Sequence, residues 1–386
     1  MTWNQIEGHD KIAADFARAF ARRRLEGSYL FTGRSGIGKR SFAFALAKTL
    51  LCRKIAALER SGDENPDFNQ FVPCGECESC RMFDAPGAES TEERDLAPKK
   101  KKKRAVAVSE QFTIPTHPDF YFVNRPPDRA FIPLELLVGA KDERMRAGLC
   151  FELSRTPYFE GRKIAVIDDA DFLNPEGANA LLKTLEEPPP KSILILIGTS
   201  AARQLPTIRS RCRTVRFSPL ETVPMVNLLL REKIVETQEE GLARAKVSNG
   251  SIAEARLYDD SALLEFRAEL FRELDGHNAV SFARRMNAFV DSAGKEAPAR
   301  RKRLAAVLVW CAEYYRDLAK TLSGAPVTGA AAMTLRQAAA AWPADANAAE
   351  RCADRTLLAM EQIDKNANLP VITEGWLYDL EKIIRR

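Results

Sequence analysis

The sequence predicts an α/β fold with a parallel sheet covered by helices on both faces, followed by a small helical lid and an all-α C-terminal domain. A short apolar segment, a glycine-rich loop and a helical pattern follow one another at residues 27–52. Two apolar segments, at residues 163–171 and 192–200, end in polar residues, which is typical of strands buried on both faces of a sheet. After residue 219 apolar residues recur at helical spacing.

The composition indicates an ordinary soluble protein. The chain has 386 residues, of which 45% are hydrophobic and 29% charged. No apolar run reaches the roughly 18 residues of a membrane span, and the N-terminus lacks a signal pattern, so we expect a cytoplasmic protein. Eight cysteines in such a compartment favour metal binding or buried thiols over disulfides. The net charge of +5 is compatible with a nucleic-acid partner without establishing one.

The first strand leads into a phosphate-binding loop. Residues 32–41, TGRSGIGKRS, match G-x-x-x-x-G-K-[ST] at every position except the last. Gly33, Gly36 and Gly38 allow sharp turns that point backbone amides at phosphate, and Lys39 would reach the β- and γ-phosphates. The strand before the loop and the helix after it are the context that supports a P-loop, so we expect ATP or ADP to be its ligand.

The last position of the motif is Arg40, where a Ser or Thr hydroxyl would hold magnesium. A guanidinium has hydrogen-bond donors and no acceptor, so Arg40 cannot be a magnesium ligand. Ser41 is the next residue with a hydroxyl. Because one residue along a helix rotates the side chain by about 100°, Ser41 would point away from the phosphate. We therefore expect weak or absent hydrolysis and no ordered magnesium.

Two further strands place polar residues beside this loop. Asp168 and Asp169 end the strand at residues 163–171, where one acid would serve magnesium and the next would polarise water. An Asp pair that ends a strand is also common in turns, which is the alternative interpretation. Thr199 ends the strand at residues 192–200, where its hydroxyl would sense a γ-phosphate.

Between these two strands, Asn174 can cap a helix with Pro175 at its first position. This helix and the segment that follows resemble a known family. Residues 177–189, GANALLKTLEEPP, and residues 205–212, LPTIRSRC, are similar to the clamp-loader ATPases of bacterial DNA polymerase III, which belong to the AAA+ class. The relevant subunits are gamma/tau and delta-prime. The resemblance is strong over about residues 1–220 and returns at residues 366–380, NANLPVITEGWLYDL.

This resemblance implies a domain plan and a set of partners. The plan is an AAA+ core at residues 1–218 with a zinc module inserted at about 52–116, a helical lid at 219–260 and a helical collar at 261–386. The collar would join other clamp-loader subunits, gamma/tau and delta, in a hetero-pentameric ring. The ring would act on the sliding clamp and on primer–template DNA, with no membrane involved.

The resemblance also assigns a role to Arg211 in the SRC sequence. In clamp loaders this arginine is a finger that reaches ATP bound to the neighbouring subunit, where a planar cation stabilises the transferring phosphoryl group. From the residues alone, RSRCR at 209–213 is only a basic turn, for which a solvated loop is the simpler interpretation.

A cysteine run follows the helix after the P-loop. Cys74, Cys77 and Cys80 are spaced so that tight turns bring their sulfur atoms to one ion, and structural zinc takes four such ligands. The family places the fourth ligand at the end of the preceding helix, which here is Cys52. His117 is the alternative fourth ligand, and a redox role for the run is the alternative function.

A block of six cations, Lys99 to Arg104, lies between this run and the next strand. Blocks of like charge repel and are usually solvated insertions. The alternative is an arm that contacts DNA phosphate.

Three positions distinguish the subunits of the family. An active gamma/tau-type motor would carry Ser or Thr at position 40, Glu after Asp168 and arginine at position 253. This chain has Arg40, Asp169 and Ala253. The sequence therefore predicts a delta-prime-like subunit that helps load the clamp and completes a neighbour's site. The alternatives are an active gamma/tau-type ATPase and an unrelated AAA+ ATPase.

Overall fold

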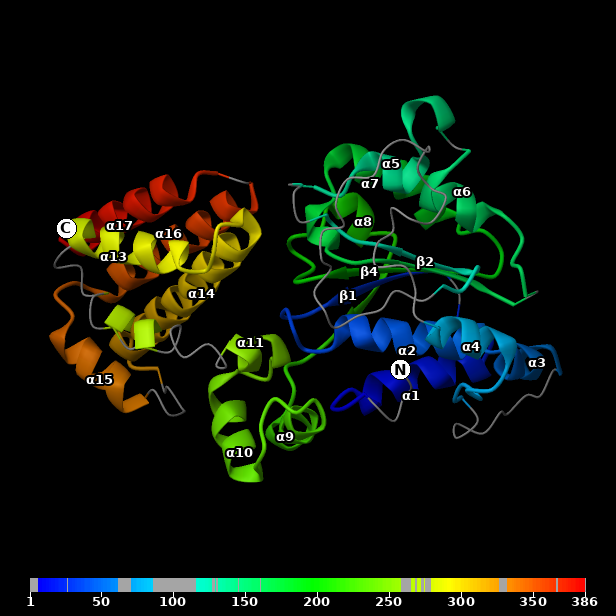
Figure 1. The fold of residues 1–386 in the computed structure, drawn as a ribbon, viewed down its shortest axis with the longest axis horizontal. Helices are drawn as coiled ribbons and strands as arrows, with labels where there is room; N and C mark the ends of the chain where they lie inside the picture. Colours follow the sequence, from blue (N-terminus) through cyan, green and yellow to red (C-terminus); the bar gives the residue numbers. More distant parts are fainter. Residues whose placement is uncertain are drawn as a thin grey trace. The chain divides into compact units, whose positions relative to one another are not determined.

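The computed structural model divides the chain into two compact units (Figure 1). One unit is Met1–Gly241 with Asn249–Ala253, and the other is Leu242–Ser248 with Glu254–Arg386. The structure describes residues 6–25, 27–61, 71–85, 116–126, 129, 131–144, 146–159, 161–257, 265–267, 269–271, 274, 279–325, 332–365 and 367–385. The basic block Lys99 to Arg104 lies outside the described residues.

The first unit is built on a parallel sheet, which within the described residues has the order β2-β3-β4-β1-β5. Its strands are Gly27–Thr32 (β1), Phe120–Val123 (β2), Lys163–Ile167 (β3), Ser192–Gly198 (β4) and Arg213–Arg216 (β5). In the register, Thr32 lies beside Gly198 of β4, and Ile167 lies beside Leu196. The carboxyl ends of β1, β3 and β4 therefore meet at the same end of the sheet.

Helices cover both faces of this sheet (Figure 1). On one face lie Asp10–Ala21 (α1), Lys39–Leu51 (α2), Arg53–Ser61 (α3) and Glu78–Asp84 (α4). On the other lie Leu134–Val138 (α5), Gly148–Ser154 (α6), Pro175–Glu186 (α7) and Pro206–Arg209 (α8). Phe31 and Val166 belong to the core on the α1–α4 face, whereas Leu30 and Ile167 belong to the opposite core. This alternation follows from the pleat of a strand buried on both sides.

Local signals in the sequence account for the helix boundaries near the sheet's carboxyl end. Gly38 precedes α2 in a left-handed conformation with φ 97°, which suits glycine. Asn174 caps α7 by accepting a hydrogen bond from Gly177 N at 2.7 Å, and Pro175 takes the first helical position. The cap and the proline had both been predicted from the sequence, and both are confirmed.

The rest of the described chain is helical. Thr222–Arg231 (α9) belongs to the first unit, while Gln238–Val247 (α10) and Ile252–Leu257 (α11) are divided between the two units. The second unit contains Ala279–Asp291 (α13), Ala297–Leu322 (α14), Ala332–Ala341 (α15), Ala346–Asp364 (α16) and Leu369–Ile384 (α17). Its core includes Trp310, Tyr315 and Trp376. No helix in the described part of the chain is long and apolar enough to cross a membrane.

Candidate functional site

The loop between β1 and α2 has the geometry of a phosphate cradle. Gly33, Gly36 and Gly38 all have positive φ angles. A Cβ atom at Gly33 would lie 2.5 Å from the Phe217 carbonyl oxygen, so no larger residue fits there. His9, at the start of α1, donates from Nε2 to the Ile37 carbonyl at 2.7 Å and holds the loop from outside. Burial lowers the pKa of His9, which favours the neutral form that makes this contact.

Lys39 lies inside the loop with only 7% of its surface exposed. Its Nζ donates to the Gly33 carbonyl at 2.6 Å and also to the Arg34 carbonyl. Burial lowers the pKa of Lys39 to about 8, although three nearby carboxylates act in the opposite direction. The ammonium is therefore placed where a phosphate would sit next to it, with backbone oxygens as its present partners.

Arg40 forms an ion pair with Asp168 across the end of the sheet. Its Nε contacts Asp168 Oδ2, and the two side chains are 26% and 8% exposed. The guanidinium carbon lies 5.7 Å from the centre of the Phe122 ring. The other carboxylate oxygen of Asp168 accepts a hydrogen bond from Asp169 N at 2.9 Å. Ser41 lies half-buried in the first turn of α2. Magnesium does not fit this donor set, since the side chain at its usual hydroxyl position is a cation bound to the acid.

The two acids that follow Asp168 have different environments. Asp169 has φ 55°, and burial together with the charge of Asp168 raises its pKa to about 6. Asp171 accepts hydrogen bonds from both Thr199 N and Thr199 Oγ1 at 2.7 Å, and a further one from Gln204 Nε2. The Thr199 hydroxyl, which was expected to sense a γ-phosphate, is thus already engaged by a neighbouring carboxylate.

Residues 249–253 of the first unit pack directly on the P-loop. Ile252 N donates to the Gly36 carbonyl at 2.9 Å, and Ser251 Oγ donates to the Ser35 carbonyl at 3.0 Å. A Cβ atom at Gly36 would lie 2.4 Å from the Ala253 Cβ. The absence of a Cβ atom at Gly36 allows this close approach.

Arg211 follows α8 and is held by α7. Its guanidinium pairs with Glu186, with Nε 2.6 Å from Oε1, and also donates to the Thr207 carbonyl and to Ser210 Oγ at 3.1 Å. Its side chain remains 31% exposed. The structure thus brings Lys39, Arg40 and Asp168 together, whereas the contacts of Arg211 are with its own helix end and with Glu186.

Four cysteines form a second candidate site, which we call the cysteine cluster: Cys52, Cys74, Cys77 and Cys80. Their sulfur atoms all lie within 4.8 Å of one another. Cys52 Sγ is 3.6 Å from Cys74 Sγ and 4.0 Å from Cys77 Sγ. A zinc tetrahedron with bonds of about 2.3 Å has edges of about 3.8 Å, so the sulfur positions fit a tetrahedral metal ion.

Backbone geometry supports the cysteine cluster. Cys74 N donates to Cys52 Sγ, Cys77 N to Cys74 Sγ, and Cys80 N to Cys77 Sγ, each at 3.4 Å. The Cys80 thiol, aided by backbone N–H groups and opposed by burial, lowers the pKa of Cys52 to about 4. N–H donors and a low pKa favour the thiolate, which is the form that binds a metal.

His117, the alternative fourth ligand, has other partners. Its Nε2 lies 2.8 Å from Ser79 Oγ, and its Nδ1 accepts from Asp119 N at 3.0 Å. Nearby, the buried Lys48 of α2 pairs with Asp84 of α4 at 2.6 Å, which ties the cysteine module to the P-loop helix. The structure therefore places Cys52, and not His117, with the three other cysteines.

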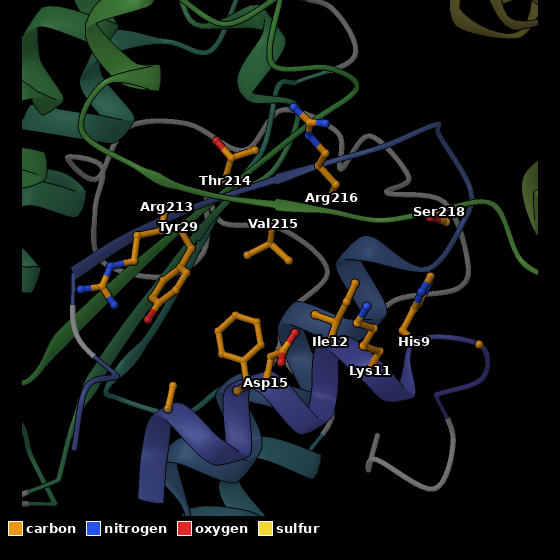
Figure 2. A pocket seen from close by; sticks show the side chains of 13 residues that line it. His9, Lys11, Ile12, Asp15, Tyr29, Arg213, Thr214, Val215, Arg216 and Ser218 are labelled. Atoms are coloured by element: carbon orange, nitrogen blue, oxygen red, sulfur yellow. The ribbon is translucent and has the colours of Figure 1, made fainter. Parts of the chain in front are cut away.

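A groove of about 570 Å³ lies between α1 and the edge strand β5. Figure 2 shows Val215 pointing from β5 toward Ile12 and Asp15 of α1. The lining also includes His9, yet none of Lys39, Arg40 and Asp168. The lining of this groove therefore does not include the charged residues at the end of the sheet.

The sequence had not singled out His9, Asp171 or Ser251. Asp171 was visible in the sequence DDAD after β3, but only the pairing of β3 with β4 places it beside Thr199. His9 and Ser251 carry no local signal, because the loop carbonyls that they contact are 28 and 216 residues away along the chain.

The parallel sheet, the loop after β1, the acids after β3 and the polar residue after β4 define a P-loop protein of the AAA+ class. Over residues 8–221 the chain matches the model of the family described as DNA polymerase III, delta subunit. Because the match covers more than half of the chain, the protein belongs to this family.

Individual relatives agree with this assignment. The DNA polymerase III subunit delta' of Pseudomonas aeruginosa is 29% identical over 247 residues, and that of Bacillus subtilis is 26% identical over 274 residues. The gamma/tau subunit of Mycobacterium tuberculosis is 29% identical over 229 residues. These alignments cover 63%, 70% and 59% of this chain, but only 58%, 66% and 30% of the relatives' own lengths. The resemblance to clamp-loader subunits predicted from the sequence is confirmed.

Proposed function

We propose that this chain is a delta-prime-like subunit of a DNA polymerase III clamp loader and helps to load the sliding clamp on primed DNA during replication. In this role it supplies Arg211 as a finger to the nucleotide of a neighbouring ATPase subunit. Its own hydrolysis is weak or absent. Membership of the family and the similarity to proteins named subunit delta' support the assignment.

The different contacts of Arg40 and Arg211 support different roles for the P-loop and for Arg211. Arg40 is paired with Asp168, so the chain's own P-loop has lost the arrangement that holds magnesium. Arg211, by contrast, keeps an exposed guanidinium whose acidic partner, Glu186, is itself 49% exposed. An exposed ion pair of this kind contributes little stability and can open when a more highly charged phosphate approaches. The chain is thus better suited to supply Arg211 to a neighbour's ATP site than to hydrolyse ATP at its own P-loop.

The proposed assembly follows the domain plan of the family. Residues 1–218 form the core with the metal module at about 52–116, residues 219–260 the lid, and residues 261–386 the collar that joins the ring. The partners are gamma/tau and delta subunits in a hetero-pentamer, together with the sliding clamp and primer–template DNA. If ATP or ADP enters the chain's own loop, the loop amides at Gly33 to Gly38 and Lys39 hold its phosphates.

We propose further that the cysteine cluster binds one structural Zn²⁺. Four sulfur atoms within 4.8 Å of one another supply all four ligands of a tetrahedral ion and leave no open position, which is typical of structural and not of catalytic zinc. The N–H groups that donate to sulfur favour the thiolate ligands that zinc requires.

The finger is tested by replacing Arg211 with Ala in the reconstituted loader with its gamma/tau and delta partners. Ring assembly should persist, while single-turnover ATP hydrolysis should fall by about 10³-fold at one site per ring. Arg209→Ala is the matched control, because Arg209 is an exposed arginine two residues away. Unchanged hydrolysis and clamp loading with Arg211→Ala would refute the role.

A further inference from the structure

The end of the sheet carries three carboxylates within four residues, at Asp168, Asp169 and Asp171. In P-loop proteins the acid after the neighbouring strand and the Ser or Thr of the loop act together on a magnesium ion. The divalent cation then offsets the negative charge at this position. Without such an ion, another positive group has to face Asp168, or its burial would be costly.

Arg40 meets this requirement from within the chain. It leaves the first turn of α2 and reaches the residue that follows β3, with Nε in contact with Asp168 Oδ2. Its guanidinium also lies near the face of Phe122 from β2, which favours a cation there. The second oxygen of Asp168 is satisfied by Asp169 N. The Asp168 carboxylate therefore has partners at both oxygens and presents no free pair of ligands to a metal.

Two further charged side chains at this end of the sheet have partners within the chain. Asp171 accepts three hydrogen bonds from Thr199 and Gln204. Lys39 donates to two carbonyls of the loop. None of these contacts requires an added ion.

We infer that the Arg40 guanidinium is a permanent, built-in replacement for the divalent cation of the P-loop. It neutralises Asp168 and fastens α2 to the end of β3, and any polyphosphate that enters the loop does so without a metal. This inference deepens the proposed weak hydrolysis of the chain's own site. It is independent of the Arg211 finger, because it concerns the isolated chain and not the ring.

The first experiment measures divalent binding to the isolated full-length chain. Mn²⁺ serves as the probe, with ADP present, and bound ion is read by electron paramagnetic resonance. The wild-type chain should bind no Mn²⁺ beyond the metal–nucleotide background. Arg40→Thr restores a hydroxyl and frees Asp168, so it should bind Mn²⁺ at least about tenfold more tightly. Arg40→Lys keeps a cation without an acceptor and should behave as wild type.

The second experiment tests the ion pair without any ligand. Arg40→Met and Asp168→Asn should each lower the unfolding midpoint of the P-loop unit by about 5 °C, because each leaves a partly buried partner unpaired. The double variant should lose little more than either single variant, which shows that the two residues act as a pair. Additive losses, or Mn²⁺ binding by the wild-type chain as tight as by Arg40→Thr, would overturn the inference.

Discussion

The P-loop and the cysteine cluster both gather ionisable side chains, but they differ in the origin of the compensating cation. At the P-loop the chain itself supplies the positive charge. Arg40 pairs with Asp168, and Lys39 lies near the same group of carboxylates. At the cysteine cluster the chain supplies sulfur ligands held in place by N–H donors. The contacts at the first site are made without a metal, whereas the sulfur positions at the second fit one. Removing the cation from each site tests this difference.

The largest effect is expected at the cysteine cluster. Cys77 supplies a ligand and also caps α4, where it accepts a hydrogen bond from Cys80 N. We expect wild-type protein to contain about one zinc per chain and Cys77→Ser to lose it. Metal loss should lower the free energy of unfolding of the first unit by on the order of 5 kcal/mol, because structural zinc couples directly to folding. Metal analysis and thermal unfolding with and without a chelator measure both quantities.

Cys212→Ser is the matched control for this experiment. Cys212 lies outside the cluster, and its thiol has a pKa raised to about 12 by burial, so it is not a thiolate ligand. The control should keep its zinc and its response to chelator. Full metal retention in Cys77→Ser, or a chelator that leaves the unfolding midpoint of wild-type protein unchanged, would contradict a structural metal at this cluster.

A smaller effect is expected at Asp171, which joins the ends of β3 and β4. Replacing it with Ala leaves Thr199 N, the Thr199 hydroxyl and the buried Gln204 amide without their acceptor. We expect a loss of about 2 kcal/mol, measured by denaturant unfolding. Asp142→Ala, on an exposed 3-10 turn, should change stability by less than about 0.5 kcal/mol. Equal effects of the two substitutions would mean that Asp171 is solvated and does not hold the site together.

Much of the fold was predictable because its signals are local. Apolar runs identified β1, β3 and β4, a glycine motif located the loop, and Asn174 with Pro175 predicted the start of α7. No secondary structure was predicted between Cys52 and Cys74. Instead, residues 53–61 form α3, and Arg162 beside β3 pairs with Glu59 of this helix. That pairing spans 103 residues, and no local pattern encodes it.

The sequence identified the residues of the candidate sites, but it could not show which of these residues contact one another. The motif identified Lys39 and Arg40, and the acids after β3 were located from the end of an apolar run. The sequence could not show that Arg40 would point inward and pair with Asp168, because a side chain at the start of a helix can also face solvent. That choice depends on the charge and the aromatic ring at the end of the sheet, which only the folded chain brings together.

The smallest expected effect concerns the pH dependence of Lys39. In the unfolded chain its pKa is the ordinary 10.5, and burial lowers it to about 8 in the folded protein. Between these two values the unfolded state binds more protons than the folded state, so stability rises with pH. The difference in unfolding free energy between wild type and Lys39→Met should therefore change in favour of wild type by about 1 kcal/mol from pH 8 to pH 9. Below about pH 7 the difference should be constant, because Lys39 is then protonated in both states.

Urea unfolding of both proteins across this range measures the difference, and contributions from all other groups cancel when the two curves are subtracted. Burial of Lys39 is opposed by the charges of Asp168, Asp169 and Asp171. The carbonyls at Gly33 and Arg34 also accept hydrogen bonds from the ammonium, which favours its charged form. If these bonds outweigh burial, the difference will stay flat up to pH 10. A flat curve would mean that Lys39 stays charged in the empty loop. The P-loop would then carry a second permanent cation beside Arg40, which would widen its contrast with the cysteine cluster.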